Sequence, residues 1–287
     1  MHSLFDVSAP AKLNLFLHVT GRRVDGYHLL QSVFMLIDWC DTLHFELRPN
    51  DKISREDLTT PLPEDDLVLK AARALQLATG STQGAHISIA KSIPAQAGMG
   101  GGSSDAATTL LALNRLWRLN LTRQQLAPIG LKLGADVPFF IHGSNAWVEG
   151  IGEKITPIDV PKAHFLVVKP ASGLSTQAIF TDPSLKRDSQ NAIISGFAAY
   201  PFSFGQNDLQ AVAQKLSLDV STALNWLEKL DLQPRMTGSG SAVFAHVSEE
   251  RIEERINQFA NLQDVPKGSI VKLCSNLAEH PLKSWAN

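Results

Sequence analysis

A cluster of glycines in the first half of the chain has the residue types of a phosphate site. Four glycines occur within residues 98–102, and Ser103 and Ser104 follow them directly. Glycines leave backbone N–H groups unhindered, and a helix that starts at such a loop turns its positive end toward an anion. The segment 94–104, called the glycine loop below, therefore predicts phosphate binding, with a simple tight turn as the alternative.

The glycine loop differs from the two commonest nucleotide-binding motifs. No Gly-Lys-Ser or Gly-Lys-Thr sequence ends it, as a Walker A motif requires, and Ser103 stands where a dinucleotide motif has its third glycine. A second glycine-rich stretch, residues 236–241, leads into an apolar segment and is called the second glycine loop. Alone, it is typical of a turn.

Two charged residues could take part in chemistry beside such a loop. Lys12 lies in a segment of alternating pattern, where a lysine is ordinarily a solvated edge residue. Asp136 follows Gly134 and precedes Val137 and Pro138. Because a proline pushes the chain before it into an extended conformation, we expect the Asp136 carboxylate to project from a loop. Taken alone, an aspartate in this position more often closes a turn.

The composition predicts a globular protein with a small-molecule partner. The 287 residues are 44% hydrophobic and 19% charged, which excludes disorder for most of the chain. At roughly 150 residues per domain, this length favours two domains. Lys and Arg number 26 against 28 Asp and Glu, so no overall basic field exists to recruit nucleic acid or an anionic lipid surface.

The cysteines and the N-terminal residues indicate a cytoplasmic protein. Cys40 and Cys274 could form one bridge at most, and no paired Cys or Cys/His spacing suggests a zinc site. Asp6 and Lys12 interrupt the start of the chain, where a signal peptide needs apolar residues. No apolar run approaches the roughly 18 residues of a membrane span. We therefore expect a reducing compartment.

The elements that must position these residues can be predicted from hydrophobic spacing. Period-two alternation predicts half-buried strands over 13–19 and 43–47, and Ile87 and Ile89 mark a further strand. Apolar spacing predicts helices over 67–78, with Gly80 as the stop, and from Ser103, Ser104 and Asp105 in a first turn to Leu116. Thr122 and Gln125 resemble a capping box for a helix that ends near Gly134, which Pro128 should kink or shorten.

The pattern resets past Pro157 and Pro161, which favours a domain boundary within 155–162. We expect domains at 1–158 and 159–287. The second should contain strands at 165–168 and 242–247, helices at 208–216 and 220–230, and a helix that holds Ile252, Ile256 and Phe259. Strands and helices are interspersed without long strand–helix–strand repeats, so the fold class is α+β rather than a doubly wound sheet.

Three segments in this order resemble the GHMP family of small-molecule kinases, which act on galactose, homoserine, mevalonate and phosphomevalonate. They are Pro10–Asn14, the glycine loop and the second glycine loop. The family's phosphate loop reads Pro-x-x-x-Gly-x-Gly-x-Ser-Ser, and here one additional glycine precedes Ser103. The resemblance implies an N-terminal domain like the second domain of ribosomal protein S5 and a ferredoxin-like C-terminal domain, with the active site between them.

Further motifs select one branch of this family. They are Gly26-Tyr27-His28, Gly134-Ala-Asp136-Val-Pro138, Glu149-Gly-Ile-Gly152-Glu and Thr237-Gly-Ser-Gly-Ser. The additional glycine of the loop belongs to the same branch. Its members phosphorylate the 2-hydroxyl of 4-diphosphocytidyl-2-C-methyl-D-erythritol in the non-mevalonate pathway of isoprenoid biosynthesis. The resemblance therefore implies that ATP is the donor, accompanied by Mg²⁺, although it does not indicate which side chains meet the metal.

The resemblance also assigns roles to individual residues. Asp136 would be the base and Lys12 its catalytic partner, which holds Asp136 ionised and offsets the charge of the moving phosphoryl group. The residues implied to bind ATP are Pro94, Ala95, Gln96, Ala97, Gly98, Met99, Gly100, Gly101, Gly102, Ser103 and Ser104. Those implied to bind the acceptor are Asn14, Tyr27, His28, Thr176, Phe180, Gly238 and Ser239.

Within the acceptor set, Tyr27 and Phe180 would stack on the cytosine and His28 would recognise its polar edge. Two alternatives stay open: another kinase of the homoserine or mevalonate type, which has no reason for Gly26-Tyr27-His28, and a nucleotide-binding regulator without catalysis, which has no need of Lys12 and Asp136. We expect a small-molecule substrate, no nucleic acid or membrane partner, and a monomer or weak homodimer.

Overall fold

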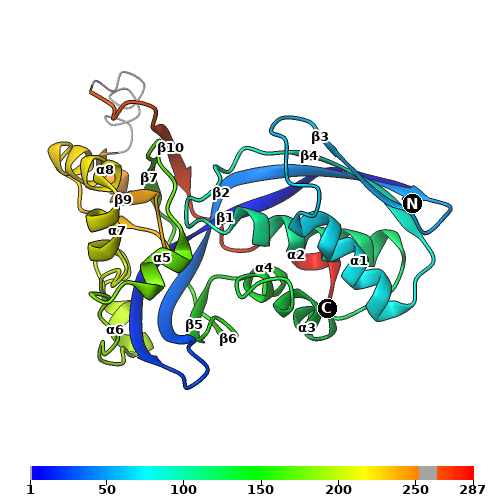
Figure 1. The fold of residues 1–287 in the computed structure, drawn as a ribbon, viewed down its shortest axis with the longest axis horizontal. Helices are drawn as coiled ribbons and strands as arrows, with labels where there is room; N and C mark the ends of the chain where they lie inside the picture. The colour runs from blue at the N-terminus through cyan, green and yellow to red at the C-terminus, as the bar shows by residue number, and fades with distance from the viewer. Residues whose placement is uncertain (1, 252–263) are drawn as a thin grey trace.

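Two β-sheets organise the chain, and the computed structural model describes residues 2–251 and 264–287 of it (Figure 1). The first sheet has the strand order β3-β4-β2-β5-β6, with β1 paired to β2, and the second has the order β10-β7-β9-β8. Among the strands of the described residues, only the β3–β4 pair is parallel. The mixture of helices and antiparallel sheets confirms the α+β class.

The elements of the described residues follow in chain order. They are β1 (Ser3–Arg22), β2 (His28–Arg48), β3 (Ile53–Asp57), α1 (Leu67–Thr79), β4 (Gly84–Ala90), α2 (Gly101–Leu116), α3 (Arg123–Leu131), α4 (Val137–His142), β5 (Ala146–Gly150), β6 (Lys154–Pro157), β7 (His164–Lys169), α5 (Thr176–Thr181), α6 (Ile194–Ala199), α7 (Gln210–Leu216), α8 (Leu218–Lys229), β8 (Pro234–Met236), β9 (Val243–Val247) and β10 (Ile270–Ser275), with short 3-10 turns at Glu249–Arg251 and Lys283–Trp285.

Helices with strong local signals form where the sequence predicts them. Asp66 caps α1, because its carboxylate accepts the Leu69 N–H at 3.0 Å, and Gly80 ends the helix with a left-handed φ of 67°. The expected capping box begins α3, which ends at Leu131, a few residues before Gly134. The helix predicted to hold Ile252, Ile256 and Phe259 lies outside the described residues.

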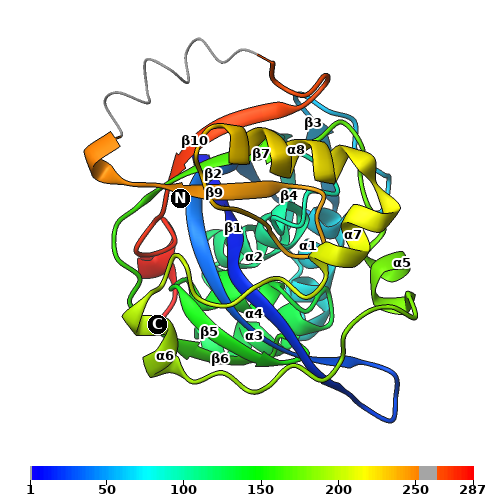
Figure 2. The same ribbon diagram turned by 90° about the vertical axis from the view of Figure 1, so that its left-hand side faces the viewer.

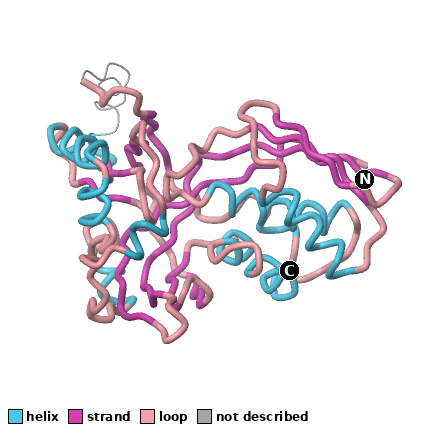
Figure 3. Tube along the Cα trace, viewed as in Figure 1, coloured by secondary structure: helices cyan, strands magenta, loops and turns pink. Residues whose placement is uncertain are grey.

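Helices α1 to α4 lie on one side of the first sheet, and α7 and α8 lie on one side of the second (Figures 1 and 3). In the larger part of the molecule α2 packs directly on the first sheet, and α1, α3 and α4 surround it. This position buries α2 on nearly every face, from Ser104 to Leu116. In the smaller part, α7 and α8 cover the second sheet and share its apolar core.

β1 corrects the expectation of a half-buried strand. Leu13 and Leu15 are buried as predicted, but the alternating Asn14 and Phe16 are also 1% and 0% exposed. The register of β1 against β2 shifts between Asn14 and Leu17, so Phe16 joins Leu13, Leu15 and Phe165 of β7 in one apolar cluster, while Asn14 is buried by its contacts with Ser32 and Thr237. A strand buried on both faces cannot be recognised from alternation alone.

The end of the chain returns to the larger part, where Figure 1 shows the C-terminus beside α3. The Arg123 N–H donates to the Asn287 carbonyl at 2.9 Å, and Leu282 belongs to the core of the first sheet. The proposed division at residues 158 and 159 stays a prediction. Whatever the boundary, the last residues of the chain pack with the N-terminal helices.

Candidate functional site

The three segments that resemble family motifs meet between the two sheets. The Lys12 N–H of β1 donates to the Met99 carbonyl in the glycine loop at 3.0 Å. On the other side of this loop, the Ser241 N–H of the second glycine loop donates to the Gln96 carbonyl at 3.1 Å. Backbone segments that are far apart in sequence are thereby fixed side by side.

Glycine at position 98 is required by this contact. Gly98 has a left-handed φ of 72°, and a Cβ there would lie 2.3 Å from the Thr237 carbonyl oxygen. Backbone atoms cannot move aside as a flexible side chain can, so any larger residue would push the two glycine loops apart. Thr237 also binds β1, because its hydroxyl accepts the Asn14 N–H at 2.9 Å.

Lys12 is buried at this junction and its ammonium has several partners. It donates to the Asn14 side-chain oxygen at 2.5 Å and to the Gly98 carbonyl at 2.9 Å. Its Nζ also lies 3.7 Å from a carboxylate oxygen of Asp136 and 4.8 Å from the centre of the Phe34 ring. Burial lowers the pKa of Lys12, and Asp136 partly offsets this effect.

Asp136 reaches Lys12 from the start of a helix, which corrects the expected loop conformation. The chain before Pro138 is helical, because Val137 and Pro138 are the first residues of α4 and Asp136 stands directly before them with φ −84° and ψ −14°, although its side chain makes no capping hydrogen bond. A proline fits the first turn of a helix, because the N–H group that it lacks would have no partner within the helix there. The side chain of Asp136 is 30% exposed, so its carboxylate is open to a ligand.

A pocket of about 480 Å³ lies beside the glycine loop. Most residues predicted to bind ATP line it, with Ser104 as the exception, because this side chain is fully buried in α2. The remaining lining residues are Leu62, Pro63, Asp66, Leu67, Lys91, Ile93 and Asp105. α2 begins at Gly101, so the pocket lies at the positive end of a helix of sixteen residues.

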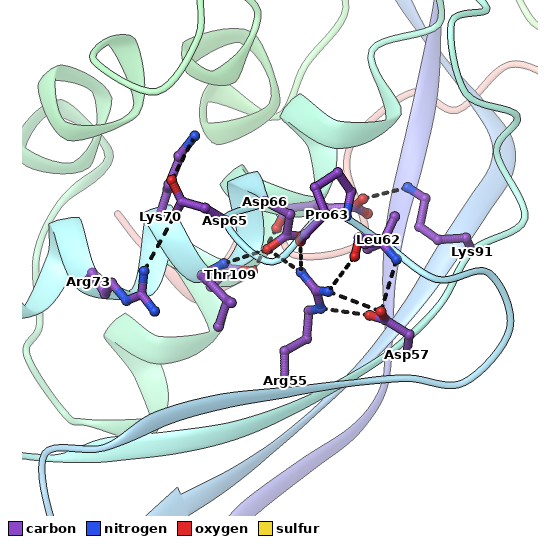
Figure 4. A network of polar contacts seen from close by, with 12 residues as sticks. Arg55, Asp57, Leu62, Pro63, Asp65, Asp66, Lys70, Arg73, Lys91 and Thr109 are labelled. Carbon is purple, nitrogen blue, oxygen red and sulfur yellow. Dashed lines mark hydrogen bonds and ion pairs between the residues drawn. The ribbon is translucent and has the colours of Figure 1, made fainter.

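One wall of the pocket is held by Arg55, as Figure 4 shows. The guanidinium pairs with both carboxylate oxygens of Asp57 at 2.6 and 3.0 Å and with Asp66 at 2.7 Å. It also donates to the carbonyls of Leu62 and Pro63 at 3.2 and 3.0 Å. All the donors of one buried arginine therefore serve the loop between β3 and α1.

A buried ion cluster lies under the other side of the pocket. Lys91 pairs with Asp105 at 2.5 Å and with Asp41, which also accepts the Ile93 N–H at 2.8 Å. The expected place of Asp105 in the first turn of its helix is wrong, because α2 already begins at Gly101. Burial, together with the neighbouring Asp41, raises the pKa of Asp105, although Lys91 opposes the shift.

The residues predicted to bind the acceptor form three groups. His28 and Phe180 come together, with ring centres 5.0 Å apart, while Tyr27 beside them is 61% exposed. Thr176, at the start of α5, and Ser239, in the second glycine loop, have hydroxyls 2.7 Å apart. Asn14 belongs with Lys12 and Asp136 instead, so the predicted acceptor residues extend from that pair to the Tyr27 turn.

Sequence reasoning missed several residues of this region. Arg55, Lys91 and Arg187 belong to no motif, and their partners lie up to 11, 50 and 159 residues away along the chain. The only signal available for Arg55 was the acidic cluster around Asp65 and Asp66, which could have indicated a cation near it. No local pattern distinguishes the other two from ordinary surface cations.

A loop of N–H groups at a helix start, beside a buried lysine and an open carboxylate, has the parts that phosphoryl transfer by a small-molecule kinase requires. Two family models match the chain: the GHMP kinases N terminal domain at residues 66–144 and the GHMP kinases C terminal domain at 194–263. The chain belongs to the GHMP kinase family. ATP is therefore its phosphoryl donor.

Three known proteins show which kinases of the family the chain is similar to. A curated relative from Albidiferax ferrireducens, named 4-diphosphocytidyl-2-C-methyl-D-erythritol kinase, is 64% identical over 286 residues, which are 100% of this chain and 96% of the relative. A crystal structure of 4-(cytidine 5'-diphospho)-2C-methyl-D-erythritol kinase is 28% identical with a TM-score of 0.77, covering 93% of this chain and 98% of that one. A homoserine kinase from Cytophaga hutchinsonii shares the fold, with a TM-score of 0.67 at 17% identity over 98% of this chain and 96% of its own.

Proposed function

We propose that the protein transfers the γ-phosphoryl group of ATP to the 2-hydroxyl of 4-diphosphocytidyl-2-C-methyl-D-erythritol, a step of the non-mevalonate pathway of isoprenoid biosynthesis. The observation that carries the proposal is the Lys12–Asp136 pair beside the glycine loop, in a chain 64% identical to a relative of that name. The homoserine kinase supports the fold alone, since it shares 17% of its residues with this chain.

The residues of the pair have complementary roles in the proposed reaction. The acceptor oxygen attacks the γ-phosphorus, its proton passes to the Asp136 carboxylate, and ADP leaves with the electron pair of the broken P–O bond. Lys12, held by Asn14 and Gly98, presents a fixed positive charge to the transferring group. Backbone N–H groups of the glycine loop bind the remaining phosphates.

We include Mg²⁺ in the proposal as the companion of ATP. Mg²⁺ prefers hard oxygen ligands and is ordinarily held by one or two protein groups together with substrate phosphates. The Ser104 hydroxyl, buried at the start of α2 without a hydrogen-bond partner among the described residues, and the Asp136 carboxylate fit this chemistry. When bound, the ion would offset charge on the β- and γ-phosphates.

The acceptor would lie between the pair and the Tyr27 turn. Tyr27 and Phe180 supply ring faces for a pyrimidine, and His28 supplies a polar edge. The hydroxyls of Thr176 and Ser239 and the backbone of Gly238 lie on the side of the second glycine loop, where they can contact the rest of the acceptor.

We also propose a cytoplasmic monomer or weak homodimer with small-molecule partners only. The free Cys40 and Cys274 fit a reducing compartment, and the net charge of −2 does not favour nucleic acid. Among the described residues, no helix is long and apolar enough to cross a bilayer. Light scattering after size-exclusion chromatography would measure the oligomeric state.

The test of the proposed function is a coupled assay of ATP consumption with three acceptors: the cytidylated methylerythritol, homoserine and mevalonate. We expect turnover with the first alone, and loss of that turnover in Asp136→Asn. Turnover with homoserine or mevalonate instead would assign the chain to another kinase type. Tight ATP binding without turnover of any acceptor would favour a regulator.

A further inference from the structure

Arg187 connects His28 and Phe180, two of the aromatic residues of the proposed cytidine site. Its Nε–H donates to Nε2 of His28 at 3.0 Å. Its Nη2 donates to the carbonyls of Phe180 and Asp182 at 3.2 and 2.8 Å, and its Nη1 donates to the Leu185 carbonyl at 2.9 Å. The same side chain therefore binds the ring of His28 and the backbone of Phe180.

The contact with His28 decides where the hydrogen of its ring resides. An arginine has five N–H donors and no acceptor, so Nε2 of His28 must supply a lone pair. In a neutral imidazole the other nitrogen then carries the hydrogen. Nδ1 of His28 has no hydrogen-bond partner among the described residues, which leaves its N–H available to a ligand.

We propose that Arg187 fixes His28 as the neutral tautomer with hydrogen on Nδ1, so that His28 offers an N–H donor to the acceptor edge of a cytosine. The inference rests on the proposed function and deepens it. Cytosine presents acceptors at O2 and N3, whereas uracil has an N–H donor at N3. A donor fixed at this position therefore selects a cytidine diphosphate group over a uridine diphosphate group.

The surroundings of His28 favour the neutral ring. Burial, then the charges of Arg187 and Arg22, lower the pKa of His28 below its ordinary value. These two arginines are the charged groups that act on it. At neutral pH the ring is therefore uncharged, and protonation at lower pH would break the Arg187 bond, because Nε2 would lose its lone pair.

Arg187 is a positioning residue in this account, and its effect is separable from a structural one. In Arg187→Met, the hydrogen should move from Nδ1 toward Nε2, and the preference of the protein for cytidine diphosphate over uridine diphosphate should fall about tenfold, the cost of one hydrogen bond. The KM of the cytidylated acceptor should rise by a similar factor, while kcat and the KM of ATP stay unchanged. Arg187→Gln, which keeps an N–H donor without the charge, should retain much of the preference.

The experiment combines ¹⁵N NMR of the histidine side chains, assigned with His28→Phe, and calorimetry with cytidine and uridine diphosphates. Lys186→Met is the matched control, because Lys186 is the neighbouring exposed cation. An unchanged Nδ1–H tautomer or an unchanged nucleotide preference in Arg187→Met would overturn the proposal. If the wild type turned over homoserine or mevalonate instead, the proposed function would fail, whereas the NMR result would still decide whether Arg187 sets the tautomer.

Discussion

At the scale of single residues, the proposed reaction depends on a lysine that is buried and an aspartate that is open. The Lys12 ammonium is held in place by Asn14 and Gly98, so Asp136 does not have to immobilise it. Asp136 instead raises the pKa of a lysine whose burial lowers it. Since the Lys12 ammonium and the Asp136 carboxylate lie 3.7 Å apart, the two should act as one unit.

We predict strong coupling between these residues. Asp136→Asn keeps the shape and removes the charge, so kcat should fall by roughly two to four powers of ten, the range of general acid–base contributions. The double variant with Lys12→Met should lose much less than the product of the two single losses. Steady-state kinetics of the four proteins measures this, with the exposed Asp51→Asn as control. Losses that multiply would contradict the coupled pair.

At the scale of elements, the loop between β3 and α1 has no regular structure and yet forms a wall of the pocket. Arg55 organises it, and Asp66 serves both this arginine and the N-terminus of α1. Burial would raise the pKa of Asp57, but the Leu62 N–H and Arg55 outweigh it and hold the pKa below its ordinary value. The ionised Asp57 therefore depends on its contacts within the wall.

We expect Arg55→Lys to loosen this wall. A lysine keeps the charge but cannot contact two carboxylates and two carbonyls in one plane, so the KM of ATP should rise about tenfold with little change in kcat. Kinetics with ATP as the varied substrate tests the expectation. Arg73→Lys is the matched control, because Arg73 is exposed and pairs only with Asp65, at 3.3 Å, in Figure 4. A fall in kcat with a normal KM would place Arg55 in another role.

The C-terminal segment is a second element whose contacts reach the site. Arg123 donates to the carbonyls of Ile141, Leu282 and Lys283, and the His280 N–H donates to the Gly143 carbonyl at 2.9 Å. These contacts fasten the end of α4, the helix that begins directly after Asp136. His280 is 2% exposed, and burial, with Arg123 and Lys283, lowers its pKa to about 3.

His280 should make the fold sensitive to acid. Its pKa is lower in the folded chain than in the unfolded one, so only the unfolded chain binds a proton between pH 6.5 and 3, and stability falls as the pH falls through this range. The free energy of unfolding should drop by about 2 kcal/mol between pH 7 and pH 5 from this group. In His280→Asn, which keeps an acceptor for the Leu282 N–H, that part of the loss should disappear. Urea unfolding at both pH values measures it, and equal losses in both proteins would refute the assignment.

At the scale of the whole molecule, features with a local sequence signal could be predicted, and features that depend on contacts between distant segments could not. The start of α1 at Asp66 and its stop at Gly80 were predictable, because caps are local. The residues of the site motifs could likewise be recognised from the sequence. By contrast, the burial of both faces of β1 and the position of Lys91 over Asp105 arise from segments that meet only in the folded chain.

The shared core between the two sheets leads to the last prediction, that both parts unfold together. Phe16 of β1, Trp147 of β5 and Phe165 of β7 belong to one apolar cluster between the sheets, so each sheet would lose part of its buried surface if the other unfolded. Phe165→Ala should lower the free energy of unfolding by about 3–5 kcal/mol and should be felt equally at both sheets.

Fluorine NMR of 5-fluorotryptophan-labelled protein during urea unfolding tests this. Trp147 reports on the first sheet and Trp226 on α8, and both are buried. Their native signals should vanish at one common urea concentration, which moves lower in Phe165→Ala for both reporters together. Phe5→Ala, the same change at a position that is 61% exposed, should leave the midpoint nearly unchanged. If the Trp226 midpoint alone moved, the two parts would be independent folding units, and the pair of Lys12 and Asp136 could form without the second sheet that buries β1.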